Sequence, residues 1–323
     1  MITIYEARDG TLKPQTGLPR VTEEAVWIDL LNPTPEEEDI IERALDMDVP
    51  TREELQEIEA SSRLFQDDGS YFMTATLVFK GGTSEAQVTP VTFILLGNRL
   101  LTVRYAEPGA FGLFLSRCNR QELDLSKGSM VLTGLLEAVV DRLADFIEHT
   151  QGHVEQLSRS VFNKNDTGAK GKHRYDLVLQ SIGHEGEIIS HVRESCYSLG
   201  RLLTYLAYAV SERKEGKVVS SRVRVAVRDV NSLTDHATFL SGKIVFLLDA
   251  TLGMIQIQQN DIIKILSVAA VVFLPPTLIA SIYGMNFHDM PELGWVFGYP
   301  FAIGMMVLFA ILPYLFFKHK GWL

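Results

Sequence analysis

The sequence contains few cysteines and no enzyme motif. Cys118 and Cys196 have no spacing typical of a metal or disulfide framework, so we expect buried thiols in a reduced compartment. No nucleophile motif or phosphate loop is found, so an enzyme is not expected. The 323 residues show no low-complexity bias and are 46% apolar, which excludes a disordered tail. A net charge of −10 argues against a broad basic face that would bind nucleic acid.

Charge is also nearly absent from the C-terminal part of the chain. Only four of the 70 Asp, Glu, Lys and Arg residues lie beyond residue 264, and residues 265–287 and 293–317 contain none. Each run exceeds the roughly 20 apolar residues that a helix needs to cross a bilayer. Two buried core helices are the alternative, but uncharged helices of this length are rare in a soluble domain. We predict a soluble body followed by a membrane hairpin.

Basic residues predict the orientation of the hairpin. Lys264 precedes the first run, Lys318 and Lys320 follow the second, and the loop between the runs has neither Lys nor Arg. By the positive-inside rule we expect both termini in the cytoplasm, and Asp289 and Glu292 of the loop outside. The first residues lack the basic and apolar regions of a signal peptide, so we expect none to be removed.

Residues 1–127 predict an α/β cytosolic domain. Seven of the 12 prolines lie before residue 110, and apolar runs alternate with turn and cap residues. We expect a strand at 26–31, a helix capped by Thr34, a strand at 71–79, and strands 91–96 and 99–104 joined at Gly97-Asn98.

From residue 128 the periodicity is helical, and no proline occurs before Pro275. Amphipathic runs at 130–162 and 175–211 predict a helical hairpin region over 128–220. A third helix is expected over 221–283, with 221–264 as its cytosolic part and 265–323 as the transmembrane domain. The expected spans are about 265–283 and 295–317.

The third helix carries a heptad-like apolar stripe. Its members fall three or four residues apart, at Val230, Leu233, Ala237, Leu240, Ile244 and Leu247, and Thr251 and Met254 continue the pattern. The stripe predicts packing against neighbouring helices of the same chain. We also expect it to contribute to self-association.

A second stripe lies on the first expected span. Polar or small residues share one side of the helix with larger apolar residues, at Asn260, Ile263, Leu266, Ser267, Ala270, Leu274, Thr277 and Ser281. Small-residue helix packing is one interpretation. A lone membrane anchor, however, needs neither the Asn260 amide nor the Thr277 and Ser281 hydroxyls. The stripe therefore favours a water-filled pore.

The first span ends in Tyr283-Gly284-Met285-Asn286-Phe287, followed by Met290-Pro-Glu-Leu293. This pattern closely resembles the CorA family of divalent-cation channels, whose mark is a Gly-Met-Asn triplet at the end of the first of two C-terminal spans. The resemblance implies a homopentameric funnel in a bacterial inner membrane, with an α/β domain followed by long helices and a two-helix hairpin. It implies passage of Mg²⁺, with Co²⁺ and Ni²⁺, and no resident cofactor. The expected partners are other copies of the chain, membrane lipids and divalent cations.

A ring of five helices agrees with the size of the ion. Two spans cannot enclose a channel, so each subunit must contribute one lining helix. Five helices about 10 Å across leave a hole of roughly 3.5 Å radius, and four leave about 2 Å. Hydrated Mg²⁺ has a radius of roughly 3.5 Å, so five is the smaller ring that passes it.

The resemblance also assigns roles to residues of this chain. It implies a selectivity filter at Gly284, Met285 and Asn286, and a pore with its gate lined by Asn260, Ile263, Leu266, Ala270, Leu274, Thr277 and Ser281. It implies regulatory Mg²⁺ between subunits at Asp249, with Glu57 as the chosen partner, although Gln56 stands where the family commonly has Asp. Asp289 and Glu292 would concentrate cations at the outer mouth, or form a solvated acidic turn.

Two other functions stay open. One is transport of Zn²⁺ or another transition metal on the same fold, coupled to protons; the absence of ionisable residues between Lys264 and His288 disfavours a proton relay. The other is a membrane-anchored sensor or scaffold that conducts nothing.

His149 and His153 have the i, i+4 spacing of a zinc site, but the sequence shows no third ligand, so we expect a solvated pair.

Overall fold

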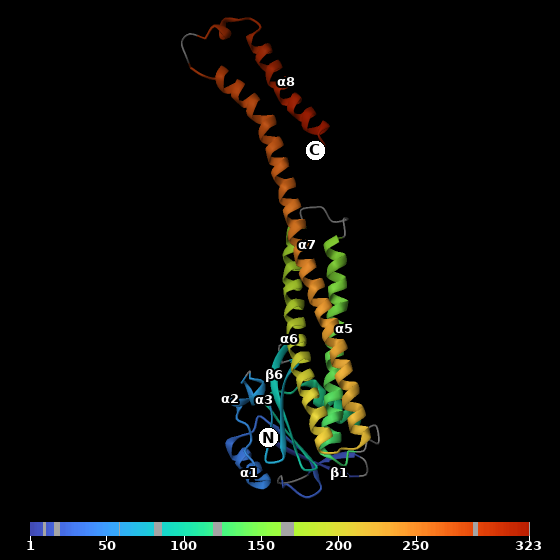
Figure 1. Ribbon diagram of the computed structural model, residues 1–323. Coiled ribbons are helices and arrows are strands. Elements are labelled where there is room, and N and C mark those ends of the chain that lie inside the picture. The colour runs from blue at the N-terminus through green and yellow to red at the C-terminus, as the bar shows by residue number, and fades with distance from the viewer. Residues whose placement is uncertain are drawn as a thin grey trace. The chain divides into compact units, whose positions relative to one another are not determined.

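The computed structural model describes residues 1–8, 11–15, 20–57, 59–80, 86–118, 125–162, 171–286 and 290–322 (Figure 1). The chain forms two units, one made mainly of residues 1–248 and the other mainly of residues 249–323. The first contains an α/β domain and long helices, as predicted.

The α/β domain is built on a seven-stranded mixed sheet with the order β2-β1-β3-β7-β6-β5-β4. Strands β3 and β7 pair in parallel and the other neighbours pair antiparallel. The strands are β1 Ile2–Arg8, β2 Thr11–Pro14, β3 Ala25–Leu31, β4 Leu64–Asp67, β5 Ser70–Lys80, β6 Ala86–Leu96 and β7 Arg99–Arg104. Four of these confirm the strands expected from the sequence.

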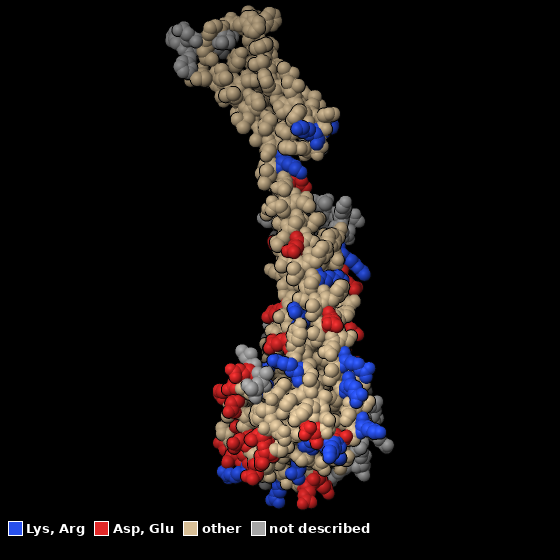
Figure 2. All heavy atoms as spheres, in the orientation of Figure 1, with Lys and Arg blue, Asp and Glu red and all other residues tan. Residues whose placement is uncertain are grey.

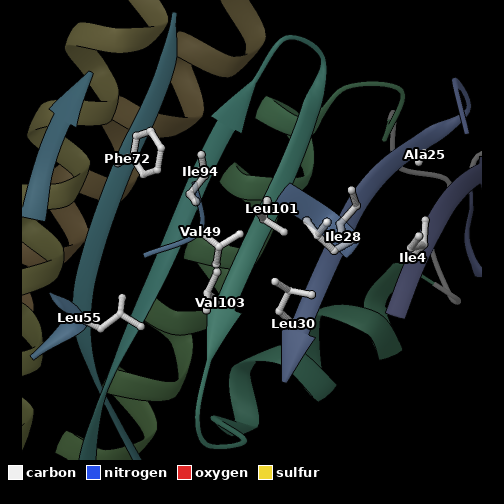
Figure 3. Close-up of a cluster of buried hydrophobic side chains, with 11 residues drawn as sticks. Ile4, Ala25, Ile28, Leu30, Val49, Leu55, Phe72, Ile94, Leu101 and Val103 are labelled. Atoms are coloured by element: carbon white, nitrogen blue, oxygen red, sulfur yellow. The ribbon is translucent and has the colours of Figure 1, made fainter. Parts of the chain in front are cut away.

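One face of the sheet is covered by α1 (Pro35–Leu45), α2 (Arg52–Leu55) and the segment between them. Ile28 and Leu30 of β3 point to this face with Val103 of β7, and Val49 and Leu55 lie against them (Figure 3). The start of α1 is as predicted, because the Thr34 hydroxyl accepts from the Glu37 amide in a capping box.

The other face carries a buried polar network beneath α4 (Gly109–Cys118). Arg104 forms a two-pronged ion pair with Asp29, at 3.0 Å from Nε to Oδ1 and 2.7 Å from Nη2 to Oδ2. Thr102 donates to Asp29 and accepts from Trp27 Nε1. The guanidinium also lies 4.3 Å from the ring centroid of Phe111. Every charge buried here is therefore paired, as a buried ion pair requires.

The hairpin between β6 and β7 has the two-residue loop that the sequence predicts. Leu96 pairs with Arg99, so Gly97 and Asn98 alone form the turn. Gly97 has φ +51°, and a positive φ at the first turn position suits glycine and belongs to the type II′ hairpin.

Three long helices follow: α5 (Gly128–Phe162), α6 (Gly171–Glu212) and α7 (Lys217–Tyr283). The heptad stripe of α7 is buried, since Val230, Ala237 and Leu240 are at most 1% exposed. The prediction of packing within the chain is confirmed, and α7 starts four residues before the expected boundary. Residues 163–170, most of the polar stretch between the first two helical runs, lie outside the described residues.

Helix α6 also completes the edge of the sheet. Strand β4 pairs with β5 only as far as Met73, so the next backbone amides of β5 need other acceptors. The Ser198 and Ser195 hydroxyls accept from the amides of Thr76 and Val78 at 2.9 and 3.3 Å. These bonds satisfy buried donors and cover an open strand edge.

The second unit contains the end of α7, a 3₁₀ turn η1 (Pro291–Gly294) and α8 (Gly298–His319). Among the described residues, α7 and α8 are long and apolar enough to cross a membrane, and only 6% of each apolar window is buried within the chain. Neither apolar window is therefore buried in a core formed by the described residues of this chain. On the face seen in Figure 2, charged side chains gather over residues before 265.

Candidate functional site

The second stripe occupies one side of α7 over residues 260–281. At about 100° per residue, its eight members fall within an arc of about 120°. All eight are exposed, with Ile263, Leu266 and Leu274 at 59%, 64% and 66%. None of the residues that the structure describes buries the stripe, so the seven predicted pore residues lie together on one exposed side of the helix.

This stripe is displaced from the one that is buried in the bundle. Continuing the buried heptad from Val230 and Ala237 leads to residues 258, 265, 272 and 279, and continuing it from Leu240 leads to 261, 268, 275 and 282. Seven of the eight members lie two residues after one of these positions. A shift of two residues turns a side chain to a different side of a helix. One helix thus presents separate sides for packing and for the candidate pore.

The two hydroxyls near the end of the stripe bond to the backbone of their own helix. Thr277 Oγ1 donates to the Phe273 carbonyl at 2.7 Å, and Ser281 Oγ donates to the Thr277 carbonyl at 2.8 Å. A hydroxyl whose proton is used in this way keeps lone pairs for other donors. Water bound to a cation presents its hydrogens outward, so these oxygens suit a hydrated cation.

Two prolines interrupt the hydrogen bonding of α7 without ending it. Pro275 and Pro276 have no amide proton, so the carbonyls of Val271 and Val272 lose their usual helical donors. The helix continues for another seven residues to Tyr283. Unbonded carbonyls at membrane depth require contact with protein or with a water-filled cavity.

The helix ends at the Gly-Met-Asn triplet. The Gly284 amide donates to the Ala280 carbonyl at 3.0 Å, and the Met285 amide to the Ile282 carbonyl at 3.2 Å. A Cβ on residue 284 would lie 3.1 Å from the Ala280 oxygen, so a side chain would crowd the last turn. Met285 and Asn286 are exposed just beyond it. The Asn286 amide can therefore contact a ligand beyond the end of the stripe.

The structure describes only the backbone of one of the two acidic residues proposed for the outer mouth. Asp289 lies outside the described residues, and the backbone of Glu292 forms part of η1.

The two proposed regulatory residues are both exposed and belong to different units. Asp249 lies on α7, and Glu57 follows α2. The Arg63 Nε atom donates to the Glu57 carbonyl at 2.6 Å and holds this segment on the sheet. Partial burial, followed by the neighbouring Arg201, lowers the pKa of the Arg63 guanidinium, which stays protonated.

Glu57 also lines an acidic pocket that sequence reasoning missed. The pocket has a volume of about 390 Å³, and its other carboxylates are Asp46, Asp48, Glu54, Asp67 and Asp68. These residues come from the end of α1, from α2 and from the turn before β5, so no local motif identifies them. Within the described ranges, no group of three or more His, Cys, Asp or Glu residues is arranged to bind a metal ion directly.

Comparison with known proteins identifies relatives over nearly the full length. The profile of the family described as CorA-like Mg2+ transporter protein matches residues 22–319. The chain is 40% identical over 299 residues to the magnesium transport protein CorA of Escherichia coli K12, which covers 93% of this chain and 92% of the relative. It is 38% identical, with the same coverage, to the protein of that name from Pasteurella multocida.

A solved structure shows the same fold. The complete structure of the CorA magnesium transporter from Methanocaldococcus jannaschii matches with a TM-score of 0.75 and 17% sequence identity. The match covers 100% of this chain and 99% of the other.

Thiol labelling can test whether the open side of α7 faces water, because we expect the two natural cysteines not to react. Cys118 and Cys196 are buried, and burial raises the pKa of both to about 11. Since the thiolate is the reactive form, both should stay unlabelled in folded protein from pH 7 to 9.

In membrane vesicles we expect Ser281→Cys and Thr277→Cys to react with a small hydrophilic thiol reagent. Ile279→Cys, at the same depth but on the opposite side of α7, should react at least about tenfold more slowly, because a thiolate forms only where water enters. Equal labelling at 279 and 281 would show that the stripe does not face water.

Proposed function

The chain belongs to the CorA-like Mg²⁺ transporter family, and on that premise we propose that it conducts Mg²⁺ across a bacterial inner membrane as a homopentameric channel. Its relatives are named magnesium transport proteins, so it is a transporter rather than an enzyme, as the sequence predicted. With two candidate spans it is an integral membrane protein. The observation that carries the proposal is the open, uncharged stripe of α7 ending in Gly284-Met285-Asn286.

Assembly into a ring is supported by the apolar surface of α7. Phe239, Val245 and Leu252 lie away from the buried heptad and are 67%, 55% and 50% exposed. Large exposed apolar surfaces typically mark protein interfaces. A second copy of α7 would cover them and bring the stripes of several chains around one axis. This arrangement gives each subunit one lining helix.

The filter acts on the hydrated ion in this proposal. Mg²⁺ gives up its water shell reluctantly, so a filter that required dehydration would be slow. Asn286 amides from five subunits, with the Thr277 and Ser281 oxygens below them, accept hydrogen bonds from the shell instead. Hydrated Co²⁺ and Ni²⁺ pass by the same contacts. The Lys residues that flank the spans favour cytoplasmic termini and an outer loop by the positive-inside rule.

The membrane potential supplies the driving force. Movement of a divalent cation into a cell whose interior is about 100 mV negative lowers its free energy by about 4.6 kcal/mol, because each elementary charge contributes about 2.3 kcal/mol. Entry needs no coupled ion under this drive. The net charge of −10, carried by residues before 265, favours accumulation of divalent cations at the cytosolic body.

The gate consists of rings of apolar side chains. Ile263, Leu266 and Leu274 project from the same side of α7. Five copies of each, brought together around a narrow pore, exclude water and so block a hydrated ion. Mg²⁺ bound between subunits at Asp249 and Glu57 favours this closed arrangement, and its loss frees the subunits to move.

Flux through proteoliposomes tests the function. The purified full chain should let Mg²⁺ enter along an imposed potential, at a rate that a proton gradient does not change and that Co²⁺ and Ni²⁺ reduce by competition. Asn286→Ala should reduce entry strongly. Entry that depends on the proton gradient favours the coupled transition-metal transporter. No Mg²⁺ entry in correctly inserted protein favours the non-conducting sensor.

The gate is tested by Leu266→Ala with high Mg²⁺ inside the vesicles. A smaller side chain weakens the apolar constriction, and each 1.36 kcal/mol removed from the barrier raises flux about tenfold. Ile265→Ala, an adjacent exposed residue on another side of α7, is the matched control and should leave flux unchanged. Wild-type flux in Leu266→Ala would place the gate elsewhere.

Regulation is tested by Asp249→Asn. Losing a charged ligand costs about 1.5–3 kcal/mol, so half-inhibition of uptake should need about 10–100 times more internal Mg²⁺. Asp261→Asn changes another exposed carboxylate of α7, one paired with Lys264 at 2.9 Å, and should leave inhibition unchanged. The same Mg²⁺ sensitivity in wild type and Asp249→Asn would exclude Asp249 as a regulatory ligand.

A further inference from the structure

A buried carboxylate of α6 contacts a histidine of α5. His153 Nδ1 lies 2.7 Å from Glu185 Oε1, and Glu185 is only 4% exposed. An ionised carboxylate can only accept, so the imidazole donates through Nδ1. The other ring nitrogen, Nε2, then carries the lone pair that binds metal ions. The expectation of a simple solvated histidine pair is incomplete, because the third partner comes from another helix.

The second carboxylate oxygen of Glu185 favours a nearby cation. Glu185 Oε2 is buried and has no hydrogen-bond partner among the residues that the structure describes. A buried carboxylate with an unpartnered oxygen is costly unless positive charge lies nearby. A metal ion on the imidazole that Glu185 already contacts would supply that charge.

His149 provides a second imidazole one turn earlier on α5. The ring centroids of His149 and His153 are 4.2 Å apart. Residues at i and i+4 lie on the same side of a helix, a spacing from which two histidines can bind one ion. His149 is exposed, so its ring can turn toward a shared ion without disturbing the core.

There is also room for water ligands beside His153 and Glu185. His153 and Glu185 line a pocket of about 570 Å³ whose other walls include Gln156, Gln180 and His184. The amide groups can hydrogen-bond to water molecules that complete the coordination of an ion.

We propose that His149 and His153 bind one transition-metal dication of the Zn²⁺, Co²⁺ and Ni²⁺ class, with Glu185 as the positioning residue. The carboxylate holds the His153 ring and raises the basicity of its free nitrogen, as in carboxylate–histidine–metal arrangements. Imidazole suits these metals, whereas Mg²⁺ prefers oxygen ligands. The site therefore distinguishes transition metals from Mg²⁺. It lies on cytosolic helices and does not depend on the transport proposal.

Competition with a chromophoric chelator measures this binding directly. The full chain in detergent micelles, with excess Mg²⁺ to occupy oxygen-ligand sites, is titrated with Zn²⁺. His149→Gln and His153→Gln should each remove one Zn²⁺ per chain from the tight-binding class. Glu185→Gln should weaken that Zn²⁺ by about 10–100-fold, the usual cost of losing a partner that orients a ligand. His191→Gln removes an imidazole of α6 that pairs with Glu187 instead, and should change nothing.

Co²⁺ absorption separates ligation from a structural role. The visible bands of bound Co²⁺ should change in His149→Gln and Glu185→Gln, while the unfolding temperature without metal stays at or above that of the wild type. His149 is exposed, so its variant keeps the fold even if another does not. Wild-type Zn²⁺ affinity in His149→Gln, or displacement of Zn²⁺ by excess Mg²⁺, would overturn the site. Loss of Mg²⁺ flux alone would leave it standing.

Discussion

The length of α7, which runs as one helix from Lys217 to Tyr283, is the constraint on which the rest of the structure depends. In a continuous helix each residue has a fixed direction relative to the others. Val230, Ala237 and Ile244 of α7 are buried, whereas Asn260 and Ser281 occupy other heptad positions of the same helix and are exposed. Because the second stripe is shifted by two residues, the helix can pack in its own bundle and still leave an open polar side. A one-residue insertion between the stripes would turn one away from the other by about 100°.

The prediction from sequence succeeded where the pattern was local. The helix cap at Thr34, the turn at Gly97-Asn98 and the heptad from Val230 each depend on residues a few positions apart, and the structure confirms all three. The Gly284-Met285-Asn286 triplet is local too, and it identified the family. Periodicity also placed the pore residues on one side of α7, although their role stays a prediction.

The features that the sequence did not predict arise from contacts between distant segments. Strand β1 joins the sheet beside β3, and β3 pairs in parallel with β7 although some 70 residues separate them. The acidic pocket draws its carboxylates from three separate segments. Glu185 of α6 contacts His153 of α5. The two residues are 32 positions apart, so the periodicity of neither helix predicts that they are partners. Such contacts follow from the way helices and strands pack.

The charged first unit precedes the charge-free segments in the chain, and this order has a consequence for biosynthesis. Residues 1–248, which include the sheet and most of the bundle, are made before the charge-free segments that follow. At about 5–20 residues per second, the ribosome needs roughly 12–50 seconds to make them, which is ample time for a domain to fold. The soluble unit can thus be complete before the first span leaves the ribosome. Membrane insertion is then a late event, because the first unit is already attached to the hairpin that enters the bilayer.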